Sequence, residues 1–429
     1  MQEALIRLGL RRAGYSSLSD FAAAKGEANG EAALERLMPW LLGYDLRQVK
    51  SGDTFGAIAR ETGTSTPVLE IANGGLDPEN LPVGRYLVVP MDFPVVPEDT
   101  PYTWQLTHYV LRGLQARYPF VQVETVGQSV GGRPLECVKL GRGSRRVYYN
   151  AAHHANEWIT VPTVLGCLEQ YARAIALNLP LGAWSPRALY QEATLYLMPL
   201  VNPDGVDLVN GAATVREEAA AREIAAAYPD IRYPEGWKAN LCGVDLNLNY
   251  PAQWDQARQI KYDLGFTGPA PRDYVGPEPL SEPESRCMFA TTRQLDPALT
   301  IAWHTQGREI YWEFMDFQPE GARTLGLQMA AASGYTLAHV AYASGFAGYK
   351  DWFIQDFDRP GYTIEAGSGE NPLPLAQLPS LIRDNLPIFL LGLSGGDPNA
   401  PEPAGGLTEG QNQGLQVAER PDGLQRTWG

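Results

Sequence analysis

Hydrophobic and polar positions divide the chain into segments of different character. In residues 1–43, leucines recur at helical spacing, as at Leu34, Leu37 and Leu41, which predicts short amphipathic helices. About 40 residues are few for an independent fold. We therefore treat this segment as a short helical addition to the larger units of the chain.

Residues 44–90 show a second pattern, in the order strand, helix, helix, strand. A strand at Gln48-Val49 leads into the turn Ser51-Gly52-Asp53-Thr54, which supplies the N-cap of the first helix. Ser65-Thr66-Pro67 starts the second helix, with proline in its first turn. The apolar strand Tyr86–Val89 completes the segment, so we expect a small βααβ module.

The rest of the chain alternates between strand and helix patterns. Residues 91–100 contain Pro94 and Pro97, which is typical of an extended linker. Residues 101–396 carry short apolar strands separated by helical stretches, and the strand candidates are Arg146–Asn150, Thr194–Leu200, Leu299–Trp303 and Tyr362–Glu365. This order predicts an α/β domain with a mixed central sheet flanked by helices. Residues 397–429 are rich in Pro, Gly and Gln and predict a flexible tail.

Composition narrows the classes of function. The 429 residues suit two or three folded units. With 34 Lys and Arg against 49 Asp and Glu, the net charge is −15, which disfavours nucleic acid as a partner. No apolar run reaches about 18 residues, so we expect no membrane span. The first residues lack a signal-peptide pattern. The four cysteines form no CxxC pair, which predicts isolated thiols.

Histidine and glutamate gather where strands end. The strand Arg146–Asn150 leads to His154, and Glu157 follows about one helical turn later, so both side chains can point the same way. His304 stands at the end of another strand. Sites in α/β sheets gather at the carboxyl ends of strands. Two histidines and one glutamate would make a catalytic zinc set with one open position. His153, the neighbour of His154, is not expected to be a ligand.

This arrangement resembles the carboxypeptidase A-like zinc peptidases, family M14. The motifs that carry the resemblance are His154-x-x-Glu157, Val201-Asn202-Pro203-Asp204-Gly205, Gly243-Val244-Asp245-Leu246-Asn247, the strand-end His304 and Thr363-Ile364-Glu365. The resemblance implies one Zn²⁺ per chain, held by the two histidines and Glu157. It also implies that Glu365 is the general base and acid, that Lys238 stabilises the oxyanion, and that Asp245 fixes the first zinc histidine. The turn residues Asn202 and Asp204 have a structural explanation by themselves.

The sequence departs from this family at its cationic residues. Leu248 and Asn156 stand where the family has arginines that hold a terminal carboxylate, so an ordinary carboxypeptidase is less favoured. Asn247 and Asn249 remain as candidate substrate-binding residues. In Gly348-Tyr349-Lys350-Asp351-Trp352, Lys350 falls where the family reads a substrate side chain, next to Tyr349. A lysine there would suit a carboxylate such as that of diaminopimelate, although a solvated lysine is an equal alternative.

Residues 44–90 resemble a LysM module in the Gly-Asp-Thr turn, the Ala72-Asn73 pair, the Leu-x-x-Gly turn and the final Val-Pro. This resemblance implies binding of N-acetylglucosamine glycans, as in peptidoglycan or chitin. Residues 1–43 resemble a shortened peptidoglycan-binding helical domain. A LysM beside an M14 domain is typical of the γ-D-glutamyl-diaminopimelate peptidase branch of that family.

The sequence therefore predicts a zinc peptidase that cleaves peptidoglycan stem peptides or muropeptides. One alternative is a general metallocarboxypeptidase on ordinary peptides, and a second is a non-catalytic cell-wall-binding protein. The expected location is the cell wall or the extracellular space. Without a visible signal peptide, cytoplasmic processing of muropeptides stays open.

Overall fold

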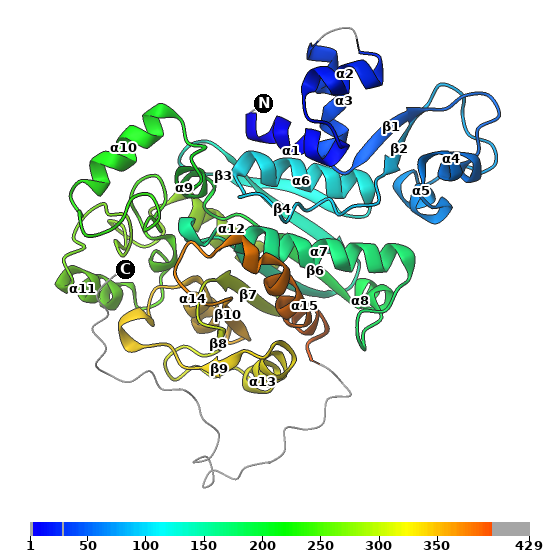
Figure 1. Cartoon of the computed structure of the whole chain (residues 1–429). Coiled ribbons are helices and arrows are strands. Elements are labelled where there is room, and N and C mark those ends of the chain that lie inside the picture. The colour runs from blue at the N-terminus through cyan, green and yellow to red at the C-terminus, as the bar shows by residue number, and fades with distance from the viewer. Residues whose placement is uncertain (1–2, 28–29, 397–429) are drawn as a thin grey trace. The chain divides into compact units, whose positions relative to one another are not determined.

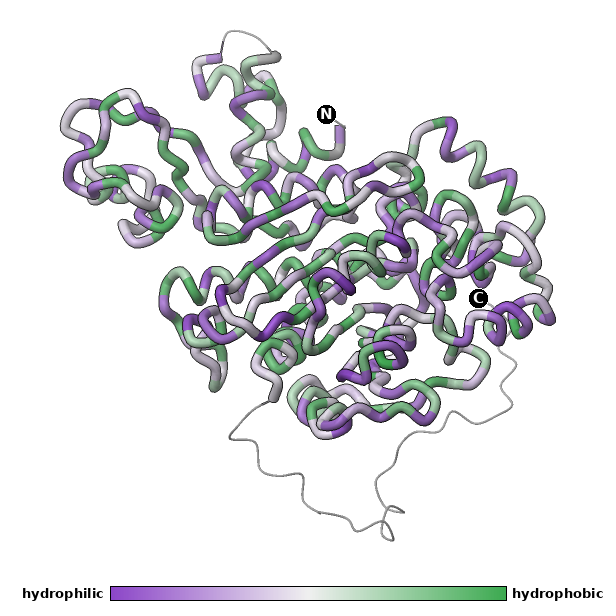
Figure 2. Tube along the Cα trace, turned by 180° about the vertical axis from the view of Figure 1, so that it is seen from behind, coloured by the Kyte–Doolittle hydropathy of each residue, from purple (hydrophilic) through white to green (hydrophobic). Residues whose placement is uncertain are grey.

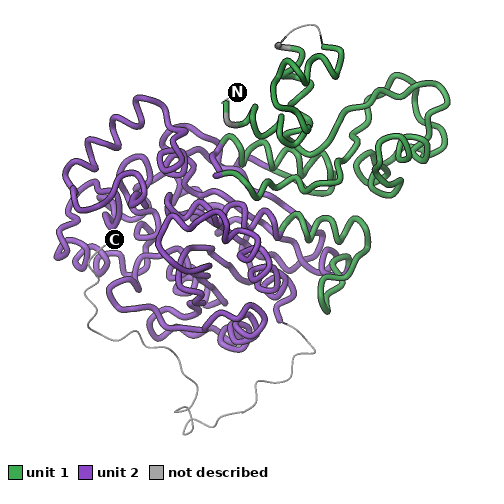
Figure 3. The backbone as a smooth tube through the Cα atoms, viewed as in Figure 1, with its two compact units in different colours: residues 1–100, 105–123, 168–187 green, residues 101–104, 124–167, 188–429 purple. Residues whose placement is uncertain are grey.

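The computed structural model describes residues 3–27 and 30–396. They form two compact units, which Figure 3 distinguishes by colour. The first contains residues up to 100 together with 105–123 and 168–187, and the second contains the remaining described residues. The predicted tail, 397–429, lies outside the described residues.

The first unit begins with three helices, α1 (Glu3–Ala13), α2 (Leu18–Lys25) and α3 (Gly30–Leu41). Leu10, Phe21 and Leu37 meet in a common core. The sequence pattern predicted short amphipathic helices here, and the structure agrees. The three helices bury their leucines by packing on one another, because a single short helix cannot bury its apolar face alone.

A βααβ module follows, with β1 (Tyr44–Gln48), α4 (Phe55–Thr62), α5 (Thr66–Ala72) and β2 (Tyr86–Pro90). The strands pair antiparallel. Thr54 caps α4 by accepting a hydrogen bond from the N–H of Ala57. The two helices bury Phe55, Ile58 and Leu69 against the strands. The predicted βααβ order is therefore confirmed.

Residues 91–100 form neither helix nor strand, and the central part of this segment is fixed to the rest of the first unit. Val95 and Val96 are buried, and their N–H groups donate to the Glu169 carboxylate at 2.7 and 2.9 Å. Arg117, at the end of α6 (Trp104–Arg117), donates to the carbonyls of Met91 and Phe93. Prolines indicated an extended backbone correctly, but an extended backbone can still be held in place by side chains distant in sequence.

The second unit is built on a mixed sheet of eight strands (Figure 1). The order across the sheet is β3-β4-β6-β5-β7-β10-β8-β9. Their bounds are β3 (Gln122–Gln128), β4 (Pro134–Gly141), β5 (Arg145–Ala151), β6 (Ala193–Met198), β7 (Leu299–His304), β8 (Glu309–Tyr311), β9 (Thr336–Ala338) and β10 (Gly361–Glu365). The central strands β6, β5, β7 and β10 run parallel, so their carboxyl ends lie at one edge.

Helices cover both faces of this sheet. Neighbouring residues of β5 point in opposite directions: the Tyr148 ring packs against Tyr349, and the Tyr149 hydroxyl donates to the Phe389 carbonyl. Tyr349 begins α14 (Tyr349–Phe357), and Phe389 belongs to α15 (Leu378–Ser394). The prediction of a mixed α/β sheet flanked by helices is confirmed.

The remaining described helices and turns complete the fold. They are α7 (Thr160–Leu177), α8 (Pro186–Glu192), α9 (Pro203–Val209), α10 (Val215–Ala225), α11 (Trp254–Asp263), α12 (Pro283–Leu295) and α13 (Ala322–Ser333), with single turns at η1 (Ala155–Glu157), η2 (Leu246–Leu248), η3 (Tyr342–Ser344) and η4 (Leu375–Gln377). Helix α10 alternates between hydrophilic and hydrophobic residues (Figure 2), and it buries Ala221 and Ala225. None of the described helices combines the length and the apolar character needed to cross a membrane.

Candidate metal centre

Two adjacent strands deliver the three predicted metal ligands. Strand β5 ends at Ala151, His154 is the N-cap of the short turn η1 that follows, and Glu157 is the last residue of η1. Strand β7 ends at His304 and pairs in parallel with β5. The ligands therefore meet at the carboxyl edge of the sheet, as expected for an α/β fold.

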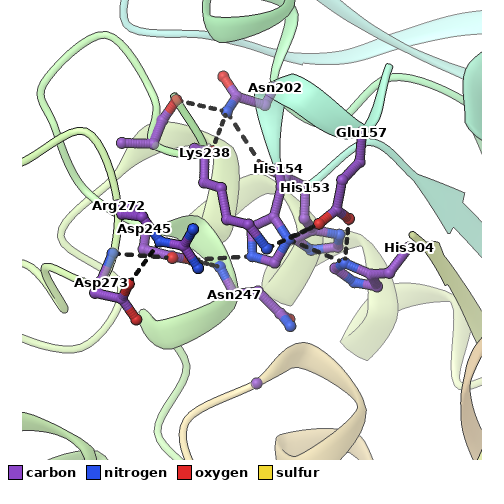
Figure 4. Close-up of polar contacts among 12 residues, drawn as sticks. His153, His154, Glu157, Asn202, Lys238, Asp245, Asn247, Arg272, Asp273 and His304 are labelled. Atoms are coloured by element: carbon purple, nitrogen blue, oxygen red, sulfur yellow. Dashed lines mark hydrogen bonds and ion pairs between the residues drawn. The ribbon is translucent and has the colours of Figure 1, made fainter. Parts of the chain in front are cut away.

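The three side chains converge on one point (Figure 4). His154 Nδ1 lies 2.9 Å from Glu157 Oε1, and His304 Nδ1 lies 3.0 Å from Glu157 Oε2. The two Nδ1 atoms are 3.2 Å apart. One ligand atom from each residue fits within 4.8 Å of the others. Two imidazoles and a carboxylate at this spacing are a suitable zinc donor set.

The partners of His154 support a cation at this point. Its Nε2 lies 3.2 Å from Asp245 Oδ1, and the carboxylate favours the proton on Nε2. The lone pair of Nδ1 then faces a Glu157 oxygen and another ring nitrogen. Acceptors directed at one another repel unless a cation or a proton lies between them. The donor set therefore fits the zinc that the family resemblance implies.

Asp245 is itself held in place. Its Oδ1 accepts from the N–H of Asn247, and its Oδ2 accepts from the N–H of Asp273 at 3.2 Å. Burial alone would raise the pKa of Asp245, but His154 and Lys238 outweigh burial and hold this pKa well below its usual range. For His154, burial is likewise outweighed by carboxylates, chiefly Glu157, so its pKa rises to about 9 without a metal. The ionised Asp245 fixes both the tautomer and the orientation of its partner.

Lys238 reaches the same centre. Its Nζ donates to Glu157 Oε1 at 3.0 Å. The backbone of Lys238 is fixed because its N–H donates to Pro271 and its carbonyl accepts from the N–H of Ala155. The side-chain amide of Asn202 donates to the His153 carbonyl at 3.1 Å and to the Ala239 carbonyl at 3.0 Å, which ties the segment of Lys238 to the end of β5. The cation predicted from the sequence thus lies beside the metal ligands.

Glu365 ends β10, directly opposite His304 in the parallel register. Burial raises the pKa of Glu365 to about 8, and the nearby Glu157 carboxylate adds to the rise. Glu309 of β8 is its register partner on the other side. A half-buried carboxyl group at this edge of the sheet has the environment of a group that takes up and releases protons near neutral pH.

The sequence reasoning missed Asn371. Its Nδ2 donates to the Thr305 carbonyl at 2.9 Å and lies 3.5 Å from Glu157 Oε1, and its Oδ1 accepts from the Thr305 hydroxyl at 2.7 Å. Asn371 therefore links the residue after His304 to the carboxylate of Glu157. The Asn371-Pro372 dipeptide was the only local signal, and such a dipeptide indicates a turn rather than a site.

Two of the predicted substrate-binding residues have structural roles. Asn249 is fully buried, and its amide bonds the Val275 carbonyl, the Ser285 hydroxyl and other neighbours in the interior. Tyr349 is also fully buried, with its hydroxyl bonded to Thr292 and Thr300. The polar atoms of both side chains are therefore used in hydrogen bonds inside the protein.

Lys350 has partners of its own as well. Only 4% of its side chain is exposed, and its Nζ lies 2.6 Å from Asp351 Oδ1 and bonds the Glu313 carbonyl. A substrate carboxylate would have to displace Asp351. These contacts therefore do not support the prediction that Lys350 binds a substrate side chain.

The remaining predicted residues also have defined partners. Asn247 lies beside Asp245, and its Oδ1 accepts from the N–H of Tyr349 at 3.0 Å. His153 lies outside the ligand cluster, where its Nε2 contacts the Tyr250 hydroxyl at 3.0 Å. Asn156, which stands where the family has an arginine, is buried and donates to the Glu235 carbonyl.

Comparison with known proteins agrees with this geometry. The family model for zinc carboxypeptidases matches residues 107–387, and the LysM domain model matches residues 48–90. The chain is 40% identical over 292 residues to γ-D-glutamyl-L-diamino acid endopeptidase 1 of Lysinibacillus sphaericus, which covers 68% of this chain and 72% of that protein. It is 39% identical over 265 residues to the uncharacterized protein YqgT of Bacillus subtilis, covering 61% and 68%.

Solved structures show the same fold. The crystal structure of carboxypeptidase A from Helicoverpa armigera superposes with a TM-score of 0.54 at 18% identity, over 70% of this chain and 74% of that one. Zinc is the metal of the family whose model spans most of the chain, and the three converging ligands suit it. The chain belongs to the M14 family of zinc carboxypeptidase-like metallopeptidases and carries a LysM domain before its peptidase domain.

Proposed function

We propose that this protein is a zinc-dependent peptidase that cleaves the stem peptides of peptidoglycan at the γ-D-glutamyl–diaminopimelate bond. The observation that carries the proposal is the complete ligand set in a chain 40% identical to a γ-D-glutamyl-L-diamino acid endopeptidase. Leu248, at the position of the carboxylate-binding arginine, supports a substrate other than that of an ordinary carboxypeptidase.

The side chains at the centre suit amide hydrolysis. Zinc, when bound to His154, Glu157 and His304, supplies a Lewis acid and makes water more acidic. Glu365 accepts the proton of the attacking water and delivers it to the departing nitrogen. The Lys238 ammonium stabilises the charge that develops on the carbonyl oxygen, although it lacks the planar fork of an arginine.

We propose further that the module 44–90 holds the enzyme on glycan strands that contain N-acetylglucosamine. The match to the LysM domain model supports this, as do the exposed apolar side chains Val83 and Tyr86 on either side of the turn into β2. A second weak site raises the local substrate concentration by orders of magnitude. Such a module also favours association with the cell wall.

Mass spectrometry of defined muropeptides after incubation with the zinc-loaded protein tests the proposal. We expect release of diaminopimelate-containing products and little action on a simple peptide with a free C-terminus. Efficient cleavage of the simple peptide would instead indicate a general metallocarboxypeptidase. Zinc retention with no turnover on any substrate would indicate a non-catalytic wall-binding protein.

A further inference from the structure

The carboxylate of Glu157 has partners besides the two metal-ligand histidines that it contacts in Figure 4. Its Oε1 accepts from Lys238 Nζ at 3.0 Å and lies 3.5 Å from Asn371 Nδ2, and its Oε2 accepts from the N–H of Thr305 at 3.2 Å. Lys238 has a flexible four-carbon stem and is the proposed oxyanion group, so its bond to Glu157 need not last when a substrate binds. Thr305 and Asn371 are the partners that have no part in the proposed reaction.

Asn371 fixes the buried Thr305 at two points. Its Nδ2 donates to the Thr305 carbonyl at 2.9 Å, and its Oδ1 accepts from the Thr305 hydroxyl at 2.7 Å. These bonds set the orientation of the amide, because a flipped amide would place Oδ1 against the Thr305 carbonyl oxygen, which cannot donate. With its hydroxyl and its carbonyl both held, Thr305 directs its N–H at Glu157 Oε2.

The loop that carries Asn371 is itself anchored beside the metal centre. It begins directly after Glu365 of β10, where the N–H of Ala366 donates to the His304 carbonyl at 2.8 Å. Beyond Asn371, the side chain of Leu373 is buried. Asn371 is therefore presented to the metal ligands by a segment that is fixed on both sides of it.

This arrangement prepares Glu157 for a metal before one binds. Fixing a free glutamate side chain costs rotamer entropy, and zinc binding has to overcome that cost if the side chain is not ordered beforehand. The Thr305 N–H already orders the Glu157 carboxylate, so less entropy is lost when zinc binds. Loss of a residue that holds a metal ligand typically lowers metal affinity by about 10–100-fold.

We propose that Asn371 is a positioning residue that orients Glu157, chiefly through Thr305, and thereby sets the zinc affinity of the site. It acts on the metal ligand and not on the substrate. Its effect on zinc binding follows from the metal site alone, whereas any effect on turnover rests on the proposed function. A slower reaction by itself would therefore not establish this role, and the test has to measure zinc binding.

Competition for zinc between the full-length protein and a chromophoric chelator tests the role of Asn371. We expect Asn371→Ala to raise the zinc Kd by about 10–100-fold. Glu370→Gln is the matched control, because Glu370 is the preceding residue of the same loop and its side chain is 80% exposed, so the Kd should stay unchanged. Co²⁺ bound in place of zinc adds a spectroscopic measurement, since its visible absorption depends on ligand geometry. Asn371→Ala should shift this absorption, and Glu370→Gln should not.

A second variant tests the route through Thr305. Thr305→Val removes the hydroxyl that donates to Asn371 and keeps the shape of the side chain. It should raise the zinc Kd by less than Asn371→Ala does, because the Asn371 bond to the Thr305 carbonyl remains. The double variant should lose little more zinc affinity than Asn371→Ala alone, because residues that act as one unit are not additive.

The outcomes separate this inference from the proposed function. A Kd for Asn371→Ala within about twofold of that of the unaltered protein would refute the inference, even if Tm fell, because Asn371 would then stabilise only its loop. If Asn371→Ala failed to fold, an unchanged Kd and an unchanged Co²⁺ spectrum in Thr305→Val would refute it. Failure of the zinc-loaded protein to cleave muropeptides would refute the proposed function instead, because zinc affinity is measured without any substrate.

Discussion

We expect zinc binding to need each of the three proposed metal ligands, because three protein ligands are usual at a catalytic zinc site. We therefore expect His154→Ala and His304→Ala each to lose tight zinc binding and activity. Zinc content after dialysis, measured by mass spectrometry, checks this. His339→Ala is a matched control, because His339 pairs with Glu313 outside the ligand cluster. The His339→Ala protein should therefore keep its zinc. Stoichiometric zinc in the double variant of His154 and His304 would contradict the ligand assignment.

Glu365 can be separated from the metal by a conservative change. Glu365→Gln keeps the size of the side chain but cannot carry a proton, so kcat should fall by about 10²–10⁴ while zinc content stays normal. Steady-state kinetics on a diaminopimelate-containing muropeptide checks this. A loss of less than about tenfold would mean that another group acts as the base.

Residues at strand ends were predictable, and residues whose role depends on distant neighbours were not. The ligands follow apolar strands, and parallel strands bring such ends together whatever the loops do. Lys350 falls where the family contacts a substrate side chain, and Asn249 lies two residues after the candidate Asn247. Asp351 contacts the Lys350 ammonium, and Ser285 donates to the Asn249 amide oxygen. Asn371 has no motif around it beyond an Asn-Pro turn, and its contacts to Thr305 and Glu157 come from residues that only the fold places beside it.

At the scale of elements, a buried acid joins three parts of the second unit. Glu284, in the first turn of α12, accepts from the N–H of Val130, between β3 and β4, at 2.9 Å and from the Asn240 side chain at 3.2 Å. Burial raises the pKa of Glu284 to about 7, against a usual value of 4.5, and these hydrogen bonds only partly oppose the rise. The folded protein thus favours the protonated form.

Because the folded protein binds the Glu284 proton more tightly than the unfolded chain does, this group makes the free energy of unfolding decrease as the pH rises. Stability due to the protonated Glu284 is fully present below pH 4.5 and is lost as the pH rises through about 7. We expect the free energy of unfolding to fall by on the order of 3 kcal/mol across this range from this group alone. Urea unfolding at several pH values should show a flatter profile for Glu284→Gln than for the exposed control Glu278→Gln. An unchanged profile would mean that Glu284 is already ionised in the fold.

At the scale of the whole molecule, the LysM module and the peptidase domain are expected to divide binding and catalysis between them. The prolines of residues 91–100 indicate a simple linker between these two parts. Instead Glu169 holds the N–H groups of Val95 and Val96, and a Cβ at Gly113 of α6 would clash with the Leu42 carbonyl. A truncation that ends before Val95 should therefore disturb the fold less than one that removes Val95 and Val96.

A pair of truncations tests this division. Removing residues 1–90 should keep hydrolysis of small soluble muropeptides near its original rate but weaken binding to insoluble sacculi, with some loss of stability because α6 is uncovered near Gly113. Removing residues 1–97 also takes away the two N–H donors of Glu169 and leaves this buried carboxylate with Arg117 at 3.7 Å. The loss of hydrogen bonds to a buried charged group costs about 1–3 kcal/mol. We therefore expect a clearly lower Tm for the shorter chain, measured by calorimetry alongside sacculus pull-down. Equal sacculus binding by the chain lacking residues 1–90 would contradict the glycan-binding role, and equal Tm values would show that Glu169 finds other donors once Val95 and Val96 are gone.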